Sequence, residues 1–467
     1  MSGNHGYTTV GYGDDAPIAA FATTPGGGAL TLIRCSGKGA LELVVQVFSA
    51  GEKIKGSPGN TVIHGWIVSA NEKIDEVLVS IFRAPRSYTG EDSLDICCHG
   101  GTAAGKAVME TLKSVGFRDA LPGEFTFRAF MNGKLDLTRC ESVMELVSAK
   151  TDAGRHHAVA RLSGSLETEI NEIKQILVQV LSGAEIYLDY SEDEISADEI
   201  AGRLPQKDIA LTALARLKKL SASWQLERLY QEGVTVVIAG RPNAGKSSLF
   251  NSLLKEDRSI VTEIPGTTRD WIEAWASIEG IPVRLIDTAG LRETADSVEK
   301  IGVERSRQLS REARLILYLI DGTEGITAED RDFITEYGAE TLLLLWNKAD
   351  IAPPPVSAAN DSPMVSVSAK TGEGLERLYA AIVSTISRQT SEQVPHGATI
   401  GTARQKNLVD VSRAALEEAL ALAELDEPLD LIAPLLREAV NALGEITGEV
   451  STADILEEMF SRFCVGK

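Results

Sequence analysis

Short apolar runs separated by turn-forming residues dominate the chain up to about residue 130. Four of these runs are rich in β-branched residues and are predicted to be strands, at 29–34, 62–68, 77–82 and 94–99. A polar turn around Asn71 joins the second and third runs, as in a β-hairpin. The fourth run leads into a glycine pair and then a helix predicted at 102–115. The pattern indicates a compact α+β domain.

The spacing of apolar residues changes to the period of an α-helix between about residues 137 and 229. One apolar stripe, opposite a face of acids and lysines, consists of Ile170, Ile173, Ile176 and Leu177. An acidic segment at 191–199 interrupts the helices and is predicted to be a solvated loop. Helical character stops at Gly233.

A second series of apolar strands follows, separated by helical patterns. The predicted strands are 234–239, 285–287, 315–321, 342–347 and 365–368, and a Pro-rich stretch at 352–363 reads as a surface loop. Strands that alternate with helices predict a doubly wound, parallel sheet.

Helical patterns return after about Gln393, with amphipathic stretches at 414–425 and 429–443. Ser451, with Asp454 three residues later, resembles a capping box for a last helix over 452–463. A tail of about 70 residues can hardly form a stable core alone. We therefore expect it to pack on the helices of 137–229, with the parallel sheet inserted into one helical domain.

Bulk properties narrow the class of protein. A chain of 467 residues predicts two to four domains, and its net charge of -21 disfavours a phosphate backbone as a partner except at a local basic patch. No apolar run approaches the roughly 18 residues of a membrane span, so we expect no membrane association. Five cysteines without a C-x-x-C pair, and an N-terminus without a secretion signal, favour the cytoplasm.

A glycine-rich motif follows the strand predicted at 234–239. Gly240 to Ser247 matches G-x-x-x-x-G-K-[ST], whose backbone N–H groups surround phosphates at the start of a helix. Lys246 is expected to reach the β- and γ-phosphates, and the Ser247 hydroxyl to bind Mg²⁺. The strand–loop–helix context predicts a nucleotide site, with a structural glycine turn as the alternative.

Three further motifs at strand ends select guanine. Asp287 to Gly290 (DTAG) can approach Mg²⁺ and the γ-phosphate. Asn347 to Asp350 (NKAD) supplies a carboxylate, Asp350, that accepts from guanine N1–H and its amino group and would repel adenine. Ser368 to Lys370 (SAK) offers backbone amides to the guanine O6. The order and placement of the four motifs predict a GTP-binding, GTP-hydrolysing domain between about residues 234 and 390.

The segment 262–270 (TEIPGTTRD) is expected to change with the nucleotide, and Thr268 is the predicted second Mg²⁺ ligand. Ras-like enzymes orient the attacking water with a Gln just after D-x-x-G, but here that position is Leu291. Hydrolysis therefore needs another water-orienting group and another positive charge, which a monovalent cation near Asn243 could supply. A turn-stabilising role is the alternative for Asn243.

Longer blocks resemble the MnmE (TrmE) family of tRNA-modification GTPases: GRPNAGKSSLFN, EIPGTTRD, DTAGLRETADSVEKIGVERS, NKAD and the terminal FCVGK, with TPGGGALTLIRCSG, SYTGEDSLDICCHGG and PGEFTFRAFMNGKLDL in the N-terminal part. The resemblance covers the chain from about Ala16. It implies an N-terminal α+β folate-binding and dimerisation domain, a discontinuous helical domain and an inserted Ras-like P-loop G domain, over residues 1–133, 134–229 with 393–467, and 230–392.

The resemblance also implies partners and chemistry. Such proteins form homodimers and act with an MnmG (GidA)-like flavoprotein, in a heterotetramer, on tRNA. They add a carboxymethylaminomethyl-type group to C5 of the wobble uridine, using 5-formyl- or methylene-tetrahydrofolate as the one-carbon donor. GTP is hydrolysed to GDP and phosphate as K⁺ activates G domains that meet across the dimer.

Site residues carried over by motif fall into three groups. Glu299 takes the water-orienting role and, with Lys246, is the predicted catalytic pair, while folate contacts fall on Arg34, Glu91, Lys134 and Lys467. Metal ligands are Ser247 and Thr268 for Mg²⁺, and Asn243, Thr262, Ile264 and Thr267 for K⁺. The full predicted nucleotide and cation contacts are Asn243, Ala244, Gly245, Lys246, Ser247, Ser248, Thr262, Glu263, Ile264, Pro265, Gly266, Thr267, Thr268, Asp287, Thr288, Ala289, Gly290, Asn347, Lys348, Ala349, Asp350, Ser368, Ala369 and Lys370.

Two alternatives concern function as a whole, and one concerns a single residue. A GTPase switch for ribosome assembly would use similar motifs, but the acidic chain shows no basic RNA-binding extension. A folate-binding protein with a decayed G domain is disfavoured because every G motif is intact. Cys464, in the terminal C-x-G-K, is either a nucleophilic thiol or a small apolar residue at a helix end.

Overall fold

The structure is a computed structural model, and it divides into two compact units. The first unit comprises residues 1–144, 167–207 and 414–467, and the second comprises 145–166 and 208–413. The described residues are 12, 14–24, 26–189, 204, 206–255, 272–287, 313–337, 341–354, 364–388, 397–450 and 452–466.

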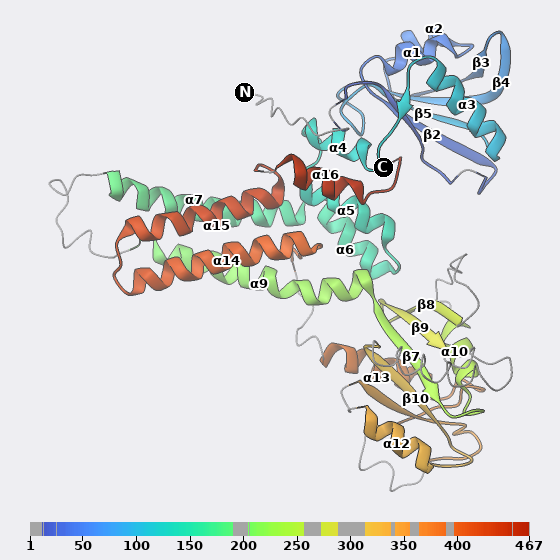
Figure 1. Cartoon of the computed structure of the whole chain (residues 1–467), viewed down its shortest axis with the longest axis vertical. Helices are drawn as coiled ribbons and strands as arrows, with labels where there is room; N and C mark the ends of the chain where they lie inside the picture. The colour runs from blue at the N-terminus through green and yellow to red at the C-terminus, as the bar shows by residue number, and fades with distance from the viewer. Residues whose placement is uncertain are drawn as a thin grey trace. The chain divides into compact units, whose positions relative to one another are not determined.

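The first unit contains a six-stranded sheet with the order β3-β4-β5-β2-β1-β6 (Figure 1). Its strands are β1 (Ile18–Phe21), β2 (Leu30–Ser36), β3 (Thr61–Ser69), β4 (Glu72–Phe82), β5 (Ser93–His99) and β6 (Arg118–Asp119). All neighbours are antiparallel except β1 and β6. Ala70 and Asn71, with φ of 47° and 68°, form the tight turn between β3 and β4 that the sequence predicts.

Three helices pack on this sheet: α1 (Ala40–Gln46), α2 (Gly51–Lys55) and α3 (Thr102–Ser114). Their apolar side chains meet alternate residues of the strands because successive side chains of a strand point to opposite faces. Ile33, Val79 and Ile96 are fully buried in that core. The layer fixes β2, which carries the predicted site residue Arg34, and β5, which begins two residues after Glu91.

The remaining helices of the first unit are α4 (Glu124–Met131), α5 (Leu137–Ser148), α7 (Ser165–Asp189), α15 (Leu429–Thr447) and α16 (Ala453–Ser461). Phe460 and Leu456 of α16 are buried with Phe127 of α4 and Leu137 of α5. Arg437 of α15 pairs with Glu185 of α7 at 2.7 Å. The C-terminal helices therefore contact the helices of 137–189, as expected for a tail too small to fold alone.

The second unit contains a six-stranded sheet with the order β12-β11-β10-β7-β9-β8. Its strands are β7 (Val234–Gly240), β8 (Ile272–Ile278), β9 (Ile281–Asp287), β10 (Leu315–Asp321), β11 (Leu342–Asn347) and β12 (Met364–Ser366). Only β8 is antiparallel to its neighbour. In this arrangement the carboxyl ends of β7, β9, β10 and β11 meet at one edge of the sheet.

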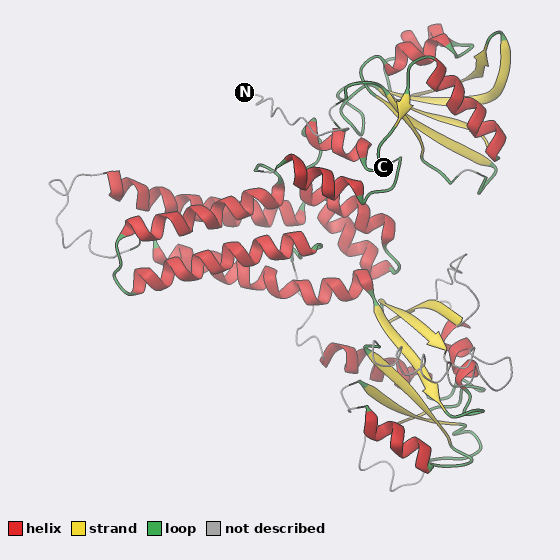
Figure 2. Cartoon of the chain, in the orientation of Figure 1, coloured by secondary structure: helices red, strands yellow, loops and turns green. Residues whose placement is uncertain are grey.

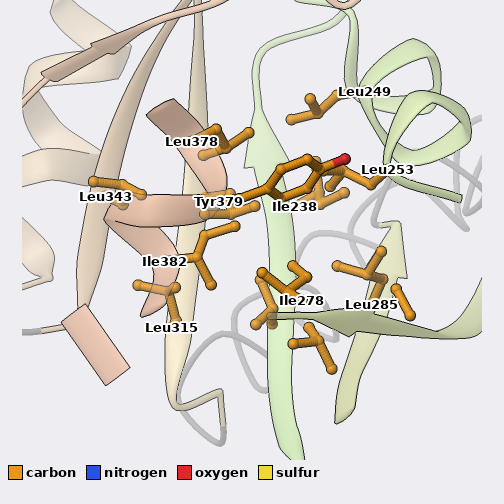
Figure 3. Packing of buried hydrophobic residues seen from close by; sticks show 14 of the residues in the cluster. Ile238, Leu249, Leu253, Ile278, Leu285, Leu315, Leu343, Leu378, Tyr379 and Ile382 are labelled. Atoms are coloured by element: carbon orange, nitrogen blue, oxygen red, sulfur yellow. The ribbon is translucent and has the colours of Figure 1, made fainter. Parts of the chain in front are cut away.

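Helices cover both faces of the second sheet, as the near-continuous apolar strands require. Alternate residues such as Ile238 and Leu315 pack against α10 (Lys246–Lys255) and α13 (Leu375–Arg388), as Figure 3 shows for one side. The intervening residues, such as Val237 and Tyr318, face α12 (Ala328–Glu336). This is the doubly wound, parallel architecture that the strand–helix alternation predicts.

Three more helices belong wholly or partly to the second unit: α6 (Asp152–Leu162), α9 (Lys207–Glu232) and α14 (Ala403–Glu424). They are drawn in red in Figure 2. Leu226 and Leu229 of α9 lie in the same buried cluster as the strands. The core of the sheet thus extends into the helix that precedes it, across the boundary expected at residue 230.

Most predicted elements coincide with observed ones, and the differences have local causes. Sequence patterns missed β1, β6 and β8, which are short or lie at or near a sheet edge, where alternation is weak. The helix predicted from residue 414 begins at Ala403, because its first turns are too polar to show an apolar stripe. The loops at 191–199 and 355–363, and the cap residue Ser451, lie outside the described residues.

No helix in the described part of the chain is long and apolar enough to span a bilayer.

Candidate nucleotide-binding site

The glycine-rich motif lies between β7 and α10, as predicted. Lys246 begins α10, and its ammonium donates to the carbonyl oxygens of Gly240 and Arg241, both at 2.8 Å. Gly245 has a φ of +100°, and a Cβ there would lie 2.2 Å from Nδ2 of Asn347. The loop therefore needs glycine at this position, both for its backbone conformation and for the side chain that packs against it.

Ser247 and Asp287 come together at the edge of the sheet. The Ser247 hydroxyl donates to Oδ2 of Asp287 at 2.8 Å, and Asp287 is fully buried at the end of β9. Hydroxyl and carboxylate oxygens are the donors that Mg²⁺ prefers, so the pair fits that ion. Among the described residues, no group of three or more His, Cys, Asp or Glu side chains could hold a metal by itself.

Asn347 connects three of the four nucleotide motifs. Its Nδ2 donates to the Ala244 carbonyl at 2.7 Å, and its Oδ1 accepts from the Ala369 amide at 3.0 Å. The side chain is buried, so both ends of the amide are satisfied inside the protein. Asn347 therefore positions the phosphate loop and the 368–370 loop relative to each other.

The residues predicted to select guanine follow β11 and β12 in the chain. Asp350 is exposed, three residues beyond the end of β11, and its carboxylate can reach a base. Lys348 has a φ of +63° and its ammonium contacts Oδ2 of Asp321 at 2.5 Å. Ser368 and Ala369 are buried, and the Ala369 carbonyl accepts from Ser252 of α10 at 2.7 Å. The described parts of all four motifs thus converge on one edge of the sheet.

Other predicted contacts can be placed only in part. Asn243 is exposed and has a φ of +64°, a conformation in which Asn is enriched, so both its turn role and a cation-binding role stay open. Ala244 is buried, Ser248 is exposed at the start of α10, Ala349 is half-buried and Lys370 is exposed. The residues outside the described part of the chain are Thr262, Glu263, Ile264, Pro265, Gly266, Thr267, Thr268, Thr288, Ala289, Gly290, Leu291, Glu299 and Lys467.

Two residues at the site had no place in the sequence predictions. Arg241, inside the phosphate loop, pairs with Glu324 at 2.7 Å and so ties the loop to the segment after β10. Asp321, at the end of β10, holds Lys348 and also accepts from the Thr323 hydroxyl at 2.6 Å. Asp321 is the last residue of a parallel strand and Arg241 directly follows one, and this placement was the signal that could have identified them.

The folate residues predicted in the first unit gather around the loop 83–92. The Glu91 carboxylate accepts from the Ser36 hydroxyl at 2.9 Å. Lys134 donates to the Pro85 carbonyl at 3.0 Å, and a Cβ on Gly90 would lie 3.3 Å from its side chain. Arg34 pairs with Asp95 at 3.1 Å and lies 5.9 Å from the centre of the Tyr88 ring. Three predicted residues therefore share one region, although Arg34 and Glu91 already have protein partners.

A buried ion network supports this region. Arg128 contacts Glu91 at 3.2 Å and Glu124 at 2.8 Å, and Arg118 contacts Glu124 at 2.6 Å. Burial by itself would raise the pKa of the Glu124 carboxyl, but the hydrogen bonds from Arg118, the Leu121 amide and Arg128 outweigh it and lower that pKa. Sequence patterns did not single out Arg128, whose ion pair with Glu91 holds that carboxylate in place.

The C-terminal segment lies against the same sheet unit. The Cys464 carbonyl accepts from the Gly123 amide at 3.3 Å, and a Cβ on Gly466 would lie 2.5 Å from the Phe21 carbonyl oxygen. Cys464 itself is exposed. The motif C-x-G-K thus reaches the N-terminal sheet through its backbone and its small glycine, and both roles for the thiol stay open.

Comparison with known proteins decides the family. A profile described as "MnmE helical domain" matches residues 137–464, and one described as "GTP-binding protein TrmE N-terminus" matches 17–134. A "tRNA modification GTPase MnmE" from Treponema denticola is 43% identical, over 97% of this chain and 98% of its own length. The chain belongs to the MnmE family of tRNA modification GTPases.

A second curated relative agrees with this membership, and a solved structure is similar to part of the chain. The MnmE protein of Carboxydothermus hydrogenoformans is 41% identical, over 96% of this chain and 99% of its own length. The G domain of the T. maritima FeoB iron transporter is a solved structure with 30% identity, which covers 32% of this chain and 98% of that chain at a TM-score of 0.25. The MnmE matches run through both sheets and the helices, so the family assignment does not depend on the nucleotide motifs alone.

Proposed function

We propose that this protein hydrolyses GTP to GDP and phosphate in the service of tRNA wobble-uridine modification. The observation that carries the proposal is the convergence of Ser247, Asp287 and Asn347 at one sheet edge, in a chain of the MnmE family. Lys246 and the backbone of its loop bind the phosphates, and Asp350 selects guanine. The printed names of the relatives favour tRNA modification over ribosome assembly.

Metal ions complete the proposed site. Ser247 and Thr268 bind Mg²⁺, with Asp287 beside Ser247, and the ion neutralises charge on the β- and γ-phosphates. Asn243, Thr262, Ile264 and Thr267 bind K⁺, which supplies a positive charge in place of an arginine finger. Glu299 orients the attacking water. Asn243 is exposed, and the oxygen of its side-chain amide is the kind of ligand that such a cation binds.

The proposed architecture follows the family. Residues 1–133 form a folate-binding domain that pairs two chains, and residues 134–229 with 393–467 form a helical domain that carries an inserted G domain at 230–392. Contacts of α15 with α7, and of α14 with α9, support a helical part built from both sides of the insertion. GTP hydrolysis is activated when two G domains meet across the homodimer.

The proposed second site binds the one-carbon donor, 5-formyl- or methylene-tetrahydrofolate. Arg34, Glu91 and Lys134 surround one loop, and Lys467 follows Gly466, which packs on β1. Cationic side chains suit the glutamate tail of the folate, and a carboxylate suits the donor edge of its pterin. With an MnmG-like flavoprotein, in a cytoplasmic heterotetramer, the protein would then modify C5 of the wobble uridine in tRNA.

Nucleoside analysis of tRNA tests the proposal directly. A strain that lacks this protein should lose the aminomethyl-type modification of wobble uridine, and the wild-type gene should restore it. A Lys246→Ala gene is the matched control, because the variant lacks the phosphate-binding ammonium and should restore little. Unchanged wobble uridines in the deletion strain would overturn the proposed function.

A further inference from the structure

The β8–β9 hairpin of the second sheet packs on the start of α6. The Lys150 ammonium lies 3.4 Å from the centre of the Trp275 ring, which is the geometry of a cation–π contact. At the hairpin turn, a Cβ on Gly280 would lie 3.2 Å from Cβ of Ala153. Burial lowers the pKa of Lys150, and nearby Arg284 lowers it further. Two points of the hairpin therefore touch the helical segment at 145–162.

Trp275 also packs against the junction between α9 and β7. Gly233, with a φ of +76°, separates these two elements. A Cβ at this position would lie 2.8 Å from the Trp275 ring and 2.5 Å from the Pro282 carbonyl oxygen. The indole thus lies between Lys150 and the point where the chain passes from helix into sheet.

A fully buried arginine lies near the C-terminal end of α6. Arg161 donates to Glu145 at 2.7 Å, to Glu227 at 2.8 Å and to the Thr399 hydroxyl at 2.9 Å. His157 contacts the second oxygen of Glu227 at 2.6 Å. We call Glu145, His157, Arg161, Glu227 and Thr399 the Arg161 cluster. Breaking a buried ion pair of this kind is strongly unfavourable, so α6, α9 and the chain around Thr399 are held together.

The Arg161 cluster lies where the chain passes into and out of the G-domain sequence. Glu227 is on the last turns of α9, which leads to β7, and Thr399 precedes α14. The Ile400 amide donates to the Ser223 hydroxyl at 3.1 Å, which joins the same two segments again. Both connections of the G domain are therefore fastened to α6.

The hairpin is directly continuous with the nucleotide motifs. β8 begins shortly after Thr268, and β9 ends at Asp287, whose carboxylate accepts from Ser247. The first residue of β8, Ile272, pairs with Asp287 in the strand register. A conformational change at either nucleotide motif therefore moves a hairpin that contacts Lys150 and Ala153.

We infer that α6, through the Lys150–Trp275 contact, couples the nucleotide site to the helices on both sides of the G domain. The path is contiguous: Asp287, the hairpin, Lys150, α6 and the Arg161 cluster. Lys150 is a positioning residue here, because the proposed effect acts through its contact with Trp275. The inference rests on the proposed function, since it assigns how GTP hydrolysis reaches the modification reaction.

The Lys150→Ala variant tests the coupling by separating two activities. Steady-state GTP hydrolysis should stay within about twofold of wild type, while wobble-uridine modification should fall about 5- to 150-fold, the range that typical coupling energies produce. Lys150→Arg keeps a cation over the ring and should restore modification. Arg155→Ala is the matched control, since Arg155 is an exposed cation five residues further along the chain, on α6, that pairs with Asp152.

Trp275→Leu removes the other side of the contact. If the two residues act as a unit, the double variant should modify tRNA no more slowly than the slower single variant. A merely structural role predicts that hydrolysis and modification fall together with the unfolding temperature, and that result would overturn the inference. Wild-type modification rates in folded Lys150→Ala protein would overturn it as well.

The wild-type protein in the same assays separates this inference from the proposed function. If the wild-type protein does not modify tRNA, the proposed function fails. If it does, and the Lys150→Ala protein does so equally well, only the coupling inference fails. Unfolding temperatures of all variants, measured in parallel, identify any loss that comes from misfolding.

Discussion

Asn347 and Asp350 lie three residues apart in one motif, and one has a structural role whereas the other faces solvent. Asn347 is buried and holds two loops together through Ala244 and Ala369. Asp350 is exposed, and its carboxylate remains available to a ligand. The exposed carboxylate of Asp350 is therefore the group proposed to select guanine, whereas Asn347 holds the loops of the site in place.

The Asp350→Asn substitution should weaken GTP binding about 10- to 100-fold, because it removes charge-assisted hydrogen bonds to guanine. Xanthosine nucleotides, which offer an acceptor where guanine has its amino group, should bind better to the variant than GTP does. Titration with both nucleotides measures the shift. Asp332→Asn, at an exposed position on α12 in the same unit, should leave both affinities unchanged, and an unaltered preference in Asp350→Asn would refute the guanine contact.

At the scale of elements, the nucleotide site depends on how strand ends are joined. β7, β9, β10 and β11 deliver Gly240, Asp287, Asp321 and Asn347 to one edge of the sheet. Buried hydrogen bonds and ion pairs then fix the described loops that follow β7, β10 and β11. The loops are therefore preorganised by the protein itself.

Asn347→Ala should destabilise the second unit by about 2–4 kcal/mol, because the Ala244 carbonyl and the Ala369 amide lose their buried partner. Nucleotide affinity should fall in parallel, since the phosphate loop loses its anchor. Urea unfolding and GDP titration measure the two effects. Asn132→Ala, which removes a hydrogen bond to the Thr89 carbonyl in the first unit, should leave GDP affinity unchanged. Undiminished GDP affinity in Asn347→Ala would contradict the anchoring role.

At the scale of the whole molecule, the two units carry different predicted sites. The first holds the folate residues Arg34, Glu91 and Lys134, and the second holds the GTP residues. The proposed activation requires two chains and a cation. The identity of the cation is the simplest variable with which to test that proposal.

Replacing Na⁺ by K⁺ at constant ionic strength should raise the rate of GTP hydrolysis about tenfold or more, which corresponds to about 1.4 kcal/mol of barrier or more. The physical reason is the positive charge that the proposed ion contributes where no arginine finger or Gln is available. Phosphate release at saturating GTP measures the effect. Asn243→Ala should lose the difference between the ions, and equal rates in both salts for the wild type would refute the cation assignment.

Local patterns in the sequence predicted a large part of this protein. The apolar runs at 315–321 and 342–347 coincide with β10 and β11, and the motif at 240–247 lies at the predicted strand–helix junction. Such features are local, because strand periodicity and the backbone requirements of a phosphate loop involve neighbouring residues. Family resemblance supplied the folate residues, which no local pattern distinguishes from surface charges.

Tertiary structure decided the features that depend on residues far apart in the chain. Asn347 meets Ala244, Arg128 meets Glu91, and Lys150 meets Trp275 only because parallel strands and packed helices bring them together. β8 was missed because a half-exposed edge strand has a weak apolar pattern. By itself the sequence determined most of the elements, the nucleotide motifs and the family. The fold decided which side chains hold those motifs in place, since that depends on packing and not on spacing along the chain.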